Sequence, residues 1–160
     1  MRITQITTSE TVRVDILFTL FVDIASFGLY KNLIKPRFAL RFMEKVIFSD
    51  KGNEYCVECK RVSFLGRMFG LMFKSRNTHN LIFDFNRSVK LSFHSYFVFF
   101  SFLIIFLDGN NKVLYKKTVE PFTLGIKPRE EYSRVIEIPL NLKNKTIIEL
   151  LVGKKKGLNI

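Results

Sequence analysis

The sequence contains no tryptophan, and its 160 residues include only two cysteines, two histidines and four prolines. Two cysteines cannot build a disulfide framework, which excludes the class of small secreted domains that depend on one. Scarce cysteine and histidine also argue against a tightly held transition metal, because zinc and copper sites use these side chains as ligands. We therefore expect no metal, no disulfide and no cofactor, in a reducing, cytoplasmic compartment.

Apolar residues are abundant, at 48% of the chain, and 18 of them are phenylalanines. This composition excludes a disordered chain, because it is enough to bury a hydrophobic core. Lysines and arginines number 26 against 14 acidic residues, a formal charge of +12. Such a charge favours an anionic partner or surface without identifying it.

Residues 1–42 differ from the rest, because an apolar run from Val14 to Tyr30 dominates them. Asp23 near the middle of the run makes a membrane span costly, by roughly 2.5–3.5 kcal/mol on insertion scales. Basic residues follow the run and would suit an anionic lipid surface: Lys31, Lys35, Arg37 and Arg41. Two interpretations of residues 1–42 stay open. They form an amphipathic or membrane-associated helical extension, or they lie upstream of a natural start at Met43. The sequence pattern slightly favours the second.

Residues 43–160 read as a β domain. Glu44–Ser49 and Glu54–Val62 flank the turn sequence at 50–53, Asp-Lys-Gly-Asn, which favours a hairpin. Ser63 is placed to cap a short helix that ends near Gly70. Further predicted strands are Leu81–Phe85, Val89–Phe100, Phe102–Leu107, Lys112–Val119, Arg134–Ile138 and Thr146–Val152. Seven or eight strands and one short helix predict a mainly β sandwich or barrel, with 91–107 forming two buried strands or one bent strand.

Five sequence blocks, in this order and spacing, carry a family resemblance. They are Gly70–Lys74, Leu81–Phe83, His94–Phe100, Ile104–Asp108 and Val135–Pro139. Together they resemble the domain-of-unknown-function family 192, also called uncharacterised protein family 0127, and its archaeal members most. The resemblance implies a compact, mainly β domain with a short helix, and it implies no known activity.

Cys56 and Cys59 have the spacing of a redox or zinc motif. A redox motif needs its first cysteine at a helix N-terminus, and a zinc site needs a second pair of ligands. Neither context is present, and residues three apart on a strand point to opposite faces. The pair is interpreted as structural.

His94, Asp108 and Glu137 are the residues with which an enzyme could work, because a histidine beside a carboxylate can act as a general base. No motif places a serine or cysteine nucleophile, and no glycine-rich elbow is present. A structural role for His94 is therefore favoured over a catalytic one.

Aromatic residues beside basic ones could instead bind nucleic acid, since exposed rings stack on bases while cations neutralise phosphates. The candidate residues for a ligand or surface contact are Arg87, Lys90, Tyr96, Lys154, Lys155 and Lys156. The simpler interpretation places the phenylalanines of 93–100 in the core and the three terminal lysines in solvent.

Three functions follow. We favour a non-enzymatic β domain that binds a protein partner or an apolar ligand. The first alternative is a basic module for weak, non-specific binding of nucleic acid or of an anionic surface, including a membrane surface through residues 14–30. The second alternative is an enzyme that uses His94 with a carboxylate.

Overall fold

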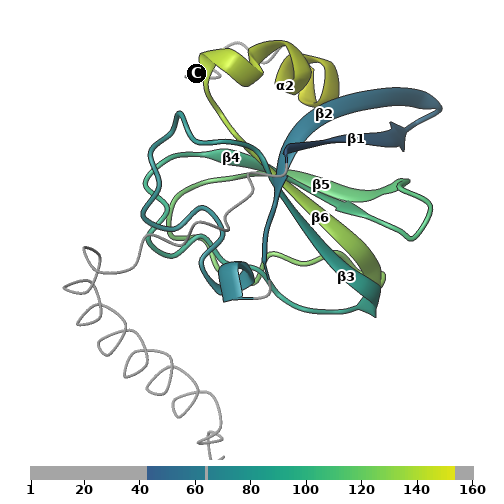
Figure 1. The fold of residues 1–160 in the computed structure, drawn as a ribbon, viewed down its shortest axis with the longest axis horizontal. Helices are drawn as coiled ribbons and strands as arrows, with labels where there is room; N and C mark the ends of the chain where they lie inside the picture. The colour runs from purple at the N-terminus through teal and green to yellow at the C-terminus, as the bar shows by residue number, and fades with distance from the viewer. Residues whose placement is uncertain (1–42, 64, 154–160) are drawn as a thin grey trace, which may run out of the picture. The chain divides into compact units, whose positions relative to one another are not determined.

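The computed structural model describes residues 43–63 and 65–153, and in this part six strands form one sheet (Figure 1). The strands are β1 (Met43–Asp50), β2 (Asn53–Arg61), β3 (Leu81–Val89), β4 (Phe102–Leu107), β5 (Val113–Val119) and β6 (Tyr132–Pro139). The helices are the α-helix α2 (Lys145–Val152) and the 3-10 helices η2 (Leu65–Met68) and η3 (Leu142–Asn144). The fold is mainly β, as the sequence predicts.

The sheet has the order β1-β2-β3-β6-β4-β5 and curls so that its two edge strands meet at one point. Only the β2–β3 pair is parallel; the other pairs are antiparallel. At the meeting point Ser49 of β1 donates its N–H to the carbonyl of Asn111, 3.0 Å away. The ammonium of Lys116 on β5 forms an ion pair with Asp50 at the end of β1. The sheet is therefore a curled half-barrel.

Both faces of the sheet are covered. The helix-side cluster lies under α2 and comprises Val46, Phe48, Val57, Cys59, Ile82, Leu103, Ile105, Leu107, Ile136, Ile138, Leu140, Ile148 and Leu151. The loop-side cluster lies under the loops that join the strands and comprises Leu71, Leu81, Phe83, Val98, Phe100, Phe102, Ile104, Phe106, Val119, Ile126, Tyr132 and Val135. Alternate residues of β4 enter the two clusters, so all six of its residues are buried. The continuous apolar sequence of β4 follows from this position.

The first hairpin is confirmed. β1 and β2 pair in register from Met43 with Lys60 to Asp50 with Asn53. Lys51 and Gly52 form the turn with φ values of +51° and +85°, in the left-handed region that this turn needs. Ser63 also has its predicted role, because its Oγ accepts the N–H of Gly66 at 3.2 Å at the start of η2.

The predicted strand at Val89–Phe100 is wrong. The prediction that residues 91–107 form two buried strands or one bent strand holds only for their second half, which is β4. Residues 90–101 are irregular apart from one bridge, Phe93 to Ile126. The Ser95 hydroxyl donates to the Glu120 carbonyl at 2.7 Å and accepts the Thr123 N–H at 2.6 Å. Such side-chain bonds to the backbone compete with the hydrogen bonds that pair one strand with the next. Phe97 then adopts a left-handed φ of +56°, which ends any extended run.

The predicted strand at Thr146–Val152 is also wrong, because this segment is the helix α2. The side chain of Asn141 accepts the N–H of Asn144 at 3.0 Å and starts the helical turns. Ile148 and Leu151, three residues apart, face the core, whereas Leu150 is 62% exposed. A short apolar run does not distinguish the two-residue period of a strand from the 3.6-residue period of a helix. In this segment the helical period applies.

Within the described residues, no helix has the length and apolar character needed to cross a membrane. The two interpretations of residues 1–42 concern residues outside the described part of the chain.

Candidate functional site

An aromatic surface lies over the loop-side cluster, built from three loops that are distant in sequence. We use the name aromatic surface for the side chains that these loops expose or half-bury, namely Phe73, Tyr96, Phe97, Phe99, Phe122 and Leu124. The Phe73 and Phe97 rings stack with centroids 5.1 Å apart, and Phe99 meets Phe122 edge-to-face at 5.7 Å. Phe73, Phe99, Phe122 and Leu124 are each more than half exposed. A group of large apolar side chains that are this exposed to solvent is typical of a surface that contacts a partner.

Three of these phenylalanines have left-handed backbones. The φ angles are +56° at Phe73, +56° at Phe97 and +58° at Phe122. Such a conformation costs a bulky L-residue about 1–2 kcal/mol. Glycine would avoid this cost at all three positions, yet each carries an aromatic ring. Strain of this kind concentrates at binding sites and switch regions, where it presets a geometry.

Hydrogen bonds fix the loops that carry the surface. The loops lie at 62–80, 90–101 and 120–131 and are called the first, second and third loop. Phe73 N–H donates to the Phe97 carbonyl at 3.0 Å, which joins the first loop to the second. Ser95 N–H donates to Thr123 O at 2.8 Å and Phe122 N–H to Ser95 O at 3.1 Å, which joins the second to the third. The aromatic surface is therefore preformed and held by its own backbone.

Glu137 lies beneath the first loop, on the loop side of β6. Its side chain is 4% exposed, and no hydrogen-bond partner among the described residues reaches its Oε2. Gly70, with a φ of +44°, packs so closely that a Cβ there would lie 3.2 Å from Oε2. Burial raises the pKa of Glu137 to about 8, although the nearby Lys74 ammonium acts to lower it.

Lys74 connects this buried carboxyl to the aromatic surface, because it directly follows Phe73 and its ammonium donates to the Gly70 carbonyl. Partial burial lowers the pKa of Lys74, while Glu137 acts to raise it. Residues 70–74 thus form a tight turn between a buried acid and an exposed ring.

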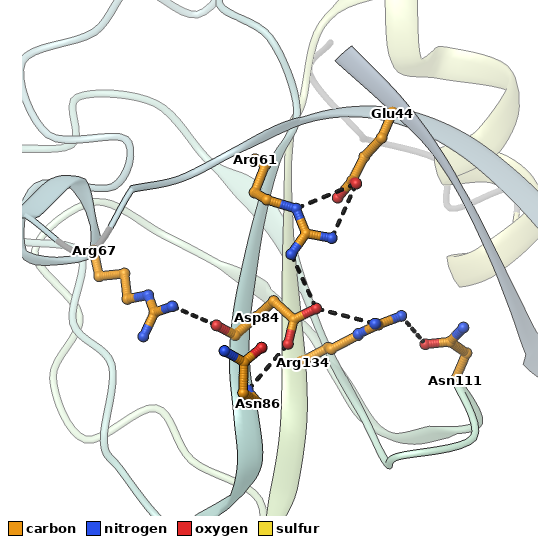
Figure 2. Close-up of polar contacts among 7 residues, drawn as sticks. All are labelled: Glu44, Arg61, Arg67, Asp84, Asn86, Asn111 and Arg134. Atoms are coloured by element: carbon orange, nitrogen blue, oxygen red, sulfur yellow. Dashed lines mark hydrogen bonds and ion pairs between the residues drawn. The ribbon is translucent and has the colours of Figure 1, made fainter. Parts of the chain in front are cut away.

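Asp84 on β3 is the centre of a charged cluster at the helix side of the sheet (Figure 2). Its Oδ2 accepts from Arg61 Nη1 at 3.2 Å and Arg134 Nη2 at 3.0 Å, and its Oδ1 accepts Asn86 N–H at 3.1 Å. Burial acts to raise the pKa of Asp84, but the hydrogen bond from Asn86 and the two guanidinium groups together lower it.

The same cluster extends to both edges of the sheet. Arg61 also donates to Glu44 Oε2 of β1 at 3.0 Å, and Arg134 donates to Asn111 Oδ1 beside β5 at 2.9 Å. Figure 2 shows this chain of contacts running across the strands. Arg67 of η2 also donates to the Asp84 backbone carbonyl, so the cluster ties several strands and the η2 segment together.

The three predicted acid–base residues do not come together. Asp108 Oδ1 accepts the N–H groups of Asn110 and Lys112 at 2.8 Å each and shapes the β4–β5 turn. Glu137 pairs in register with Ile104, four residues before Asp108 and so about 13 Å along the strand. In the described part of the chain, no hydrogen bond or ion pair joins His94 to either carboxylate; its ring lies 5.3 Å from that of Tyr96, and partial burial lowers its pKa.

The binding candidates have mixed outcomes. Tyr96 belongs to the aromatic surface and is 41% exposed. Arg87 and Lys90 are exposed near the end of β3. Residues 154–156, the lysine tail, lie outside the described residues.

The cysteine pair has the predicted geometry: Cys56 is exposed and Cys59 is buried, on opposite faces of β2. Burial raises the pKa of the Cys59 thiol to about 12, with smaller contributions from Glu44 and Cys56. Across residues 43–63 and 65–153, no three histidine, cysteine or acidic side chains gather as metal ligands.

The sequence model of a protein family described as "DUF192: Uncharacterized ACR" matches residues 46–152. This match covers α2 and the whole sheet except the first three residues of β1. The chain belongs to the DUF192 family. The resemblance seen in the sequence is confirmed, and the family has no established activity.

Among DUF192 relatives, a UPF0127 protein of the archaeon Pyrococcus horikoshii is 35% identical over 82 residues, which are 51% of this chain and 70% of the relative. Two solved structures share the fold, each with a TM-score of 0.55. One is a candidate transcription regulator from Sinorhizobium meliloti, 18% identical, matched over 67% of this chain and 87% of its own. The other is a protein of unknown function from Novosphingobium aromaticivorans, 17% identical, matched over 66% and 79%.

In this DUF192 member, sequence reasoning missed most of the aromatic surface. It placed the phenylalanines of 93–100 in the core; this holds for Phe100 at 4% exposure but not for Phe99 at 62%. Phe73 and Phe122 were not singled out at all. One signal was available, because acidic residues are absent from the segments 62–80, 90–101 and 121–129.

Proposed function

We propose that this DUF192 domain is a non-enzymatic binding module that presents its aromatic surface to an apolar partner. The observation that supports this is the left-handed backbone of three phenylalanines, Phe73, Phe97 and Phe122. The core gains little from holding two half-exposed rings and one partly buried ring in a costly conformation, so the geometry serves a contact made from outside.

Residues 43–160 would form the binding domain and residues 1–42 an appendage to it. The free thiols of Cys56 and Cys59 support a reducing compartment, and we place the module in the cytoplasm.

An anionic, aromatic dye such as anilinonaphthalene sulfonate tests the proposal on the full chain. We expect saturable binding by the native protein. The pair Phe99→Ser with Phe122→Ser should remove it, whereas Leu150→Ser, an equally exposed apolar position on α2, should leave it unchanged. Thermal unfolding of each variant shows whether it is folded. Equal dye binding by a folded surface variant and the wild type would refute the proposal.

A second candidate function is the binding of single-stranded nucleic acid. The exposed rings of Tyr96 and Phe99, with Lys90 nearby in the sequence, favour it, because bases stack on rings while cations neutralise phosphates. Such binding must weaken steeply with salt.

A further inference from the structure

We propose that the partner of the aromatic surface is a lipid bilayer with anionic headgroups. Phe99, Phe122 and Leu124 enter the apolar edge of the bilayer, and cations of the same loops contact the headgroups. This inference rests on the proposed binding function and names the class of its partner.

Charge is segregated toward the aromatic surface. The loop segments 62–80, 90–101 and 121–129 contain no aspartate or glutamate, although the chain has 14 acidic residues. The same segments contain six cations: Arg67, Lys74, Arg76, Lys90, Lys127 and Arg129. Two of them already donate within the protein, Arg67 to the Asp84 carbonyl and Lys74 to the Gly70 carbonyl. Three exposed glutamates flank the third segment: Glu120, whose carboxylate accepts from the Ser101 hydroxyl at 2.5 Å, and Glu130 and Glu131. The loops that carry the exposed rings, with these flanking glutamates, therefore hold more cations than carboxylates, which favours contact with an anionic surface.

The backbone of these loops suits a low-polarity environment. Unpaired N–H and C=O groups are costly in the apolar part of a bilayer. Here the N–H groups of Phe73, Ser95, Val98, Phe122 and Thr123 all donate within the protein. The loops can therefore approach the acyl chains without leaving these donors unsatisfied.

The chemistry of the exposed groups favours lipid over nucleic acid. Phe99, Phe122 and Leu124, at 62%, 54% and 57% exposure, have no polar side-chain atom. An aliphatic leucine gives no stacking platform, and both faces of the sheet are covered, so no flat aromatic sheet is presented to bases. A bilayer needs only buried apolar area and nearby cations.

The absence of tryptophan supplies the test. In the full chain, Phe122→Trp introduces the only tryptophan, on the aromatic surface, and Leu150→Trp introduces a matched one on α2, each excited selectively over the tyrosines. Vesicles of phosphatidylglycerol and phosphatidylcholine, with brominated acyl chains, are added to each. We expect a blue shift and quenching in Phe122→Trp but not in Leu150→Trp, and no response to pure phosphatidylcholine. If Phe122→Trp fails to fold, Phe99→Trp reports on the same surface.

Two sets of variants measure the contributions. Phe99→Ser with Leu124→Ser should lower partitioning into the anionic vesicles by about tenfold or more, because apolar area is lost. Lys90→Gln and Lys127→Gln should each lower it about fivefold at low salt. Leu150→Ser should have no effect.

Three results overturn the inference. Dye binding at the aromatic surface without any vesicle response would support the proposed binding function but refute a bilayer as the partner. Vesicle binding without quenching in Phe122→Trp shows that another part of the chain contacts lipid. A response of Phe122→Trp to a single-stranded oligonucleotide but not to vesicles assigns nucleic acid. If neither dye nor vesicle binds, the proposed function itself fails.

Discussion

Replacing Glu137 with glutamine should remove a large pH dependence of folding stability. The carboxyl is buried, its Oε2 has no partner among the described residues, and burial raises its pKa from 4.5 to about 8. Between these two values the unfolded chain releases the proton and the native chain keeps it. The unfolded state then binds fewer protons, so stability falls as the pH rises.

The expected size follows from this window. One pH unit corresponds to about 1.4 kcal/mol, so the loss from pH 5 to pH 8 is about 4 kcal/mol. Below pH 4.5 both states hold the proton, and above pH 8 neither does, so the contribution is constant outside the window. For a domain with about 5–15 kcal/mol of total stability, this is a large share.

Urea unfolding of the full chain, followed by circular dichroism at pH 5, 6.5 and 8, measures the effect. The wild type should lose about 4 kcal/mol more across this range than Glu137→Gln does. Glu58→Gln, which changes an exposed glutamate on β2, should behave like the wild type. Parallel stability curves for the wild type and Glu137→Gln would refute the idea that the native protein holds this proton.

Three further changes test the architecture. At Phe122, with its φ of +58°, glycine should give a protein about 1 kcal/mol more stable than alanine does, the reverse of the usual order, in thermal or urea unfolding. Asp84→Ala should cost about 1–3 kcal/mol at neutral pH, because it removes a largely buried carboxylate that accepts from Arg61, Arg134 and the Asn86 N–H. A cost that does not shrink as the pH falls below about 4 would contradict the ion-pair account. Asn144→Ala should cost about 1–3 kcal/mol, since its buried amide donates to Asn80 Oδ1 and Pro139 O, and an unchanged urea midpoint would count against this role.

The elements that the sequence predicts well are those with a strong local signal. The β1–β2 hairpin has turn residues, Lys51 and Gly52, whose chemistry fixes the register. β4 is predicted because its apolar, β-branched run ends in the Asp108 turn. Cys56 and Cys59 fall on opposite faces because strand periodicity is two.

The elements that it misses depend on distant partners. The irregular path of 90–101 needs Ser95 to bond with Glu120 and Thr123, which no local pattern reveals. The environment of Glu137 depends on Gly70, a residue of another loop. Glu137 itself is identified from the sequence as a carboxylate on a strand, but its burial is a property of the assembled fold.

The strand pairing that joins the β1–β2 hairpin to β3 is short. Only two residue pairs, Lys60 with Leu81 and Arg61 with Ile82, connect β2 to β3, whereas β6 pairs along most of its length with β3 and β4. We expect the hairpin to open before the centre of the sheet, although its opening must break the Ser49 and Asp50 contacts with the β5 edge and remove its apolar side chains from the helix-side cluster. Amide protons in the hairpin should exchange with solvent through this partial opening, and those of β4 and β6 only through global unfolding.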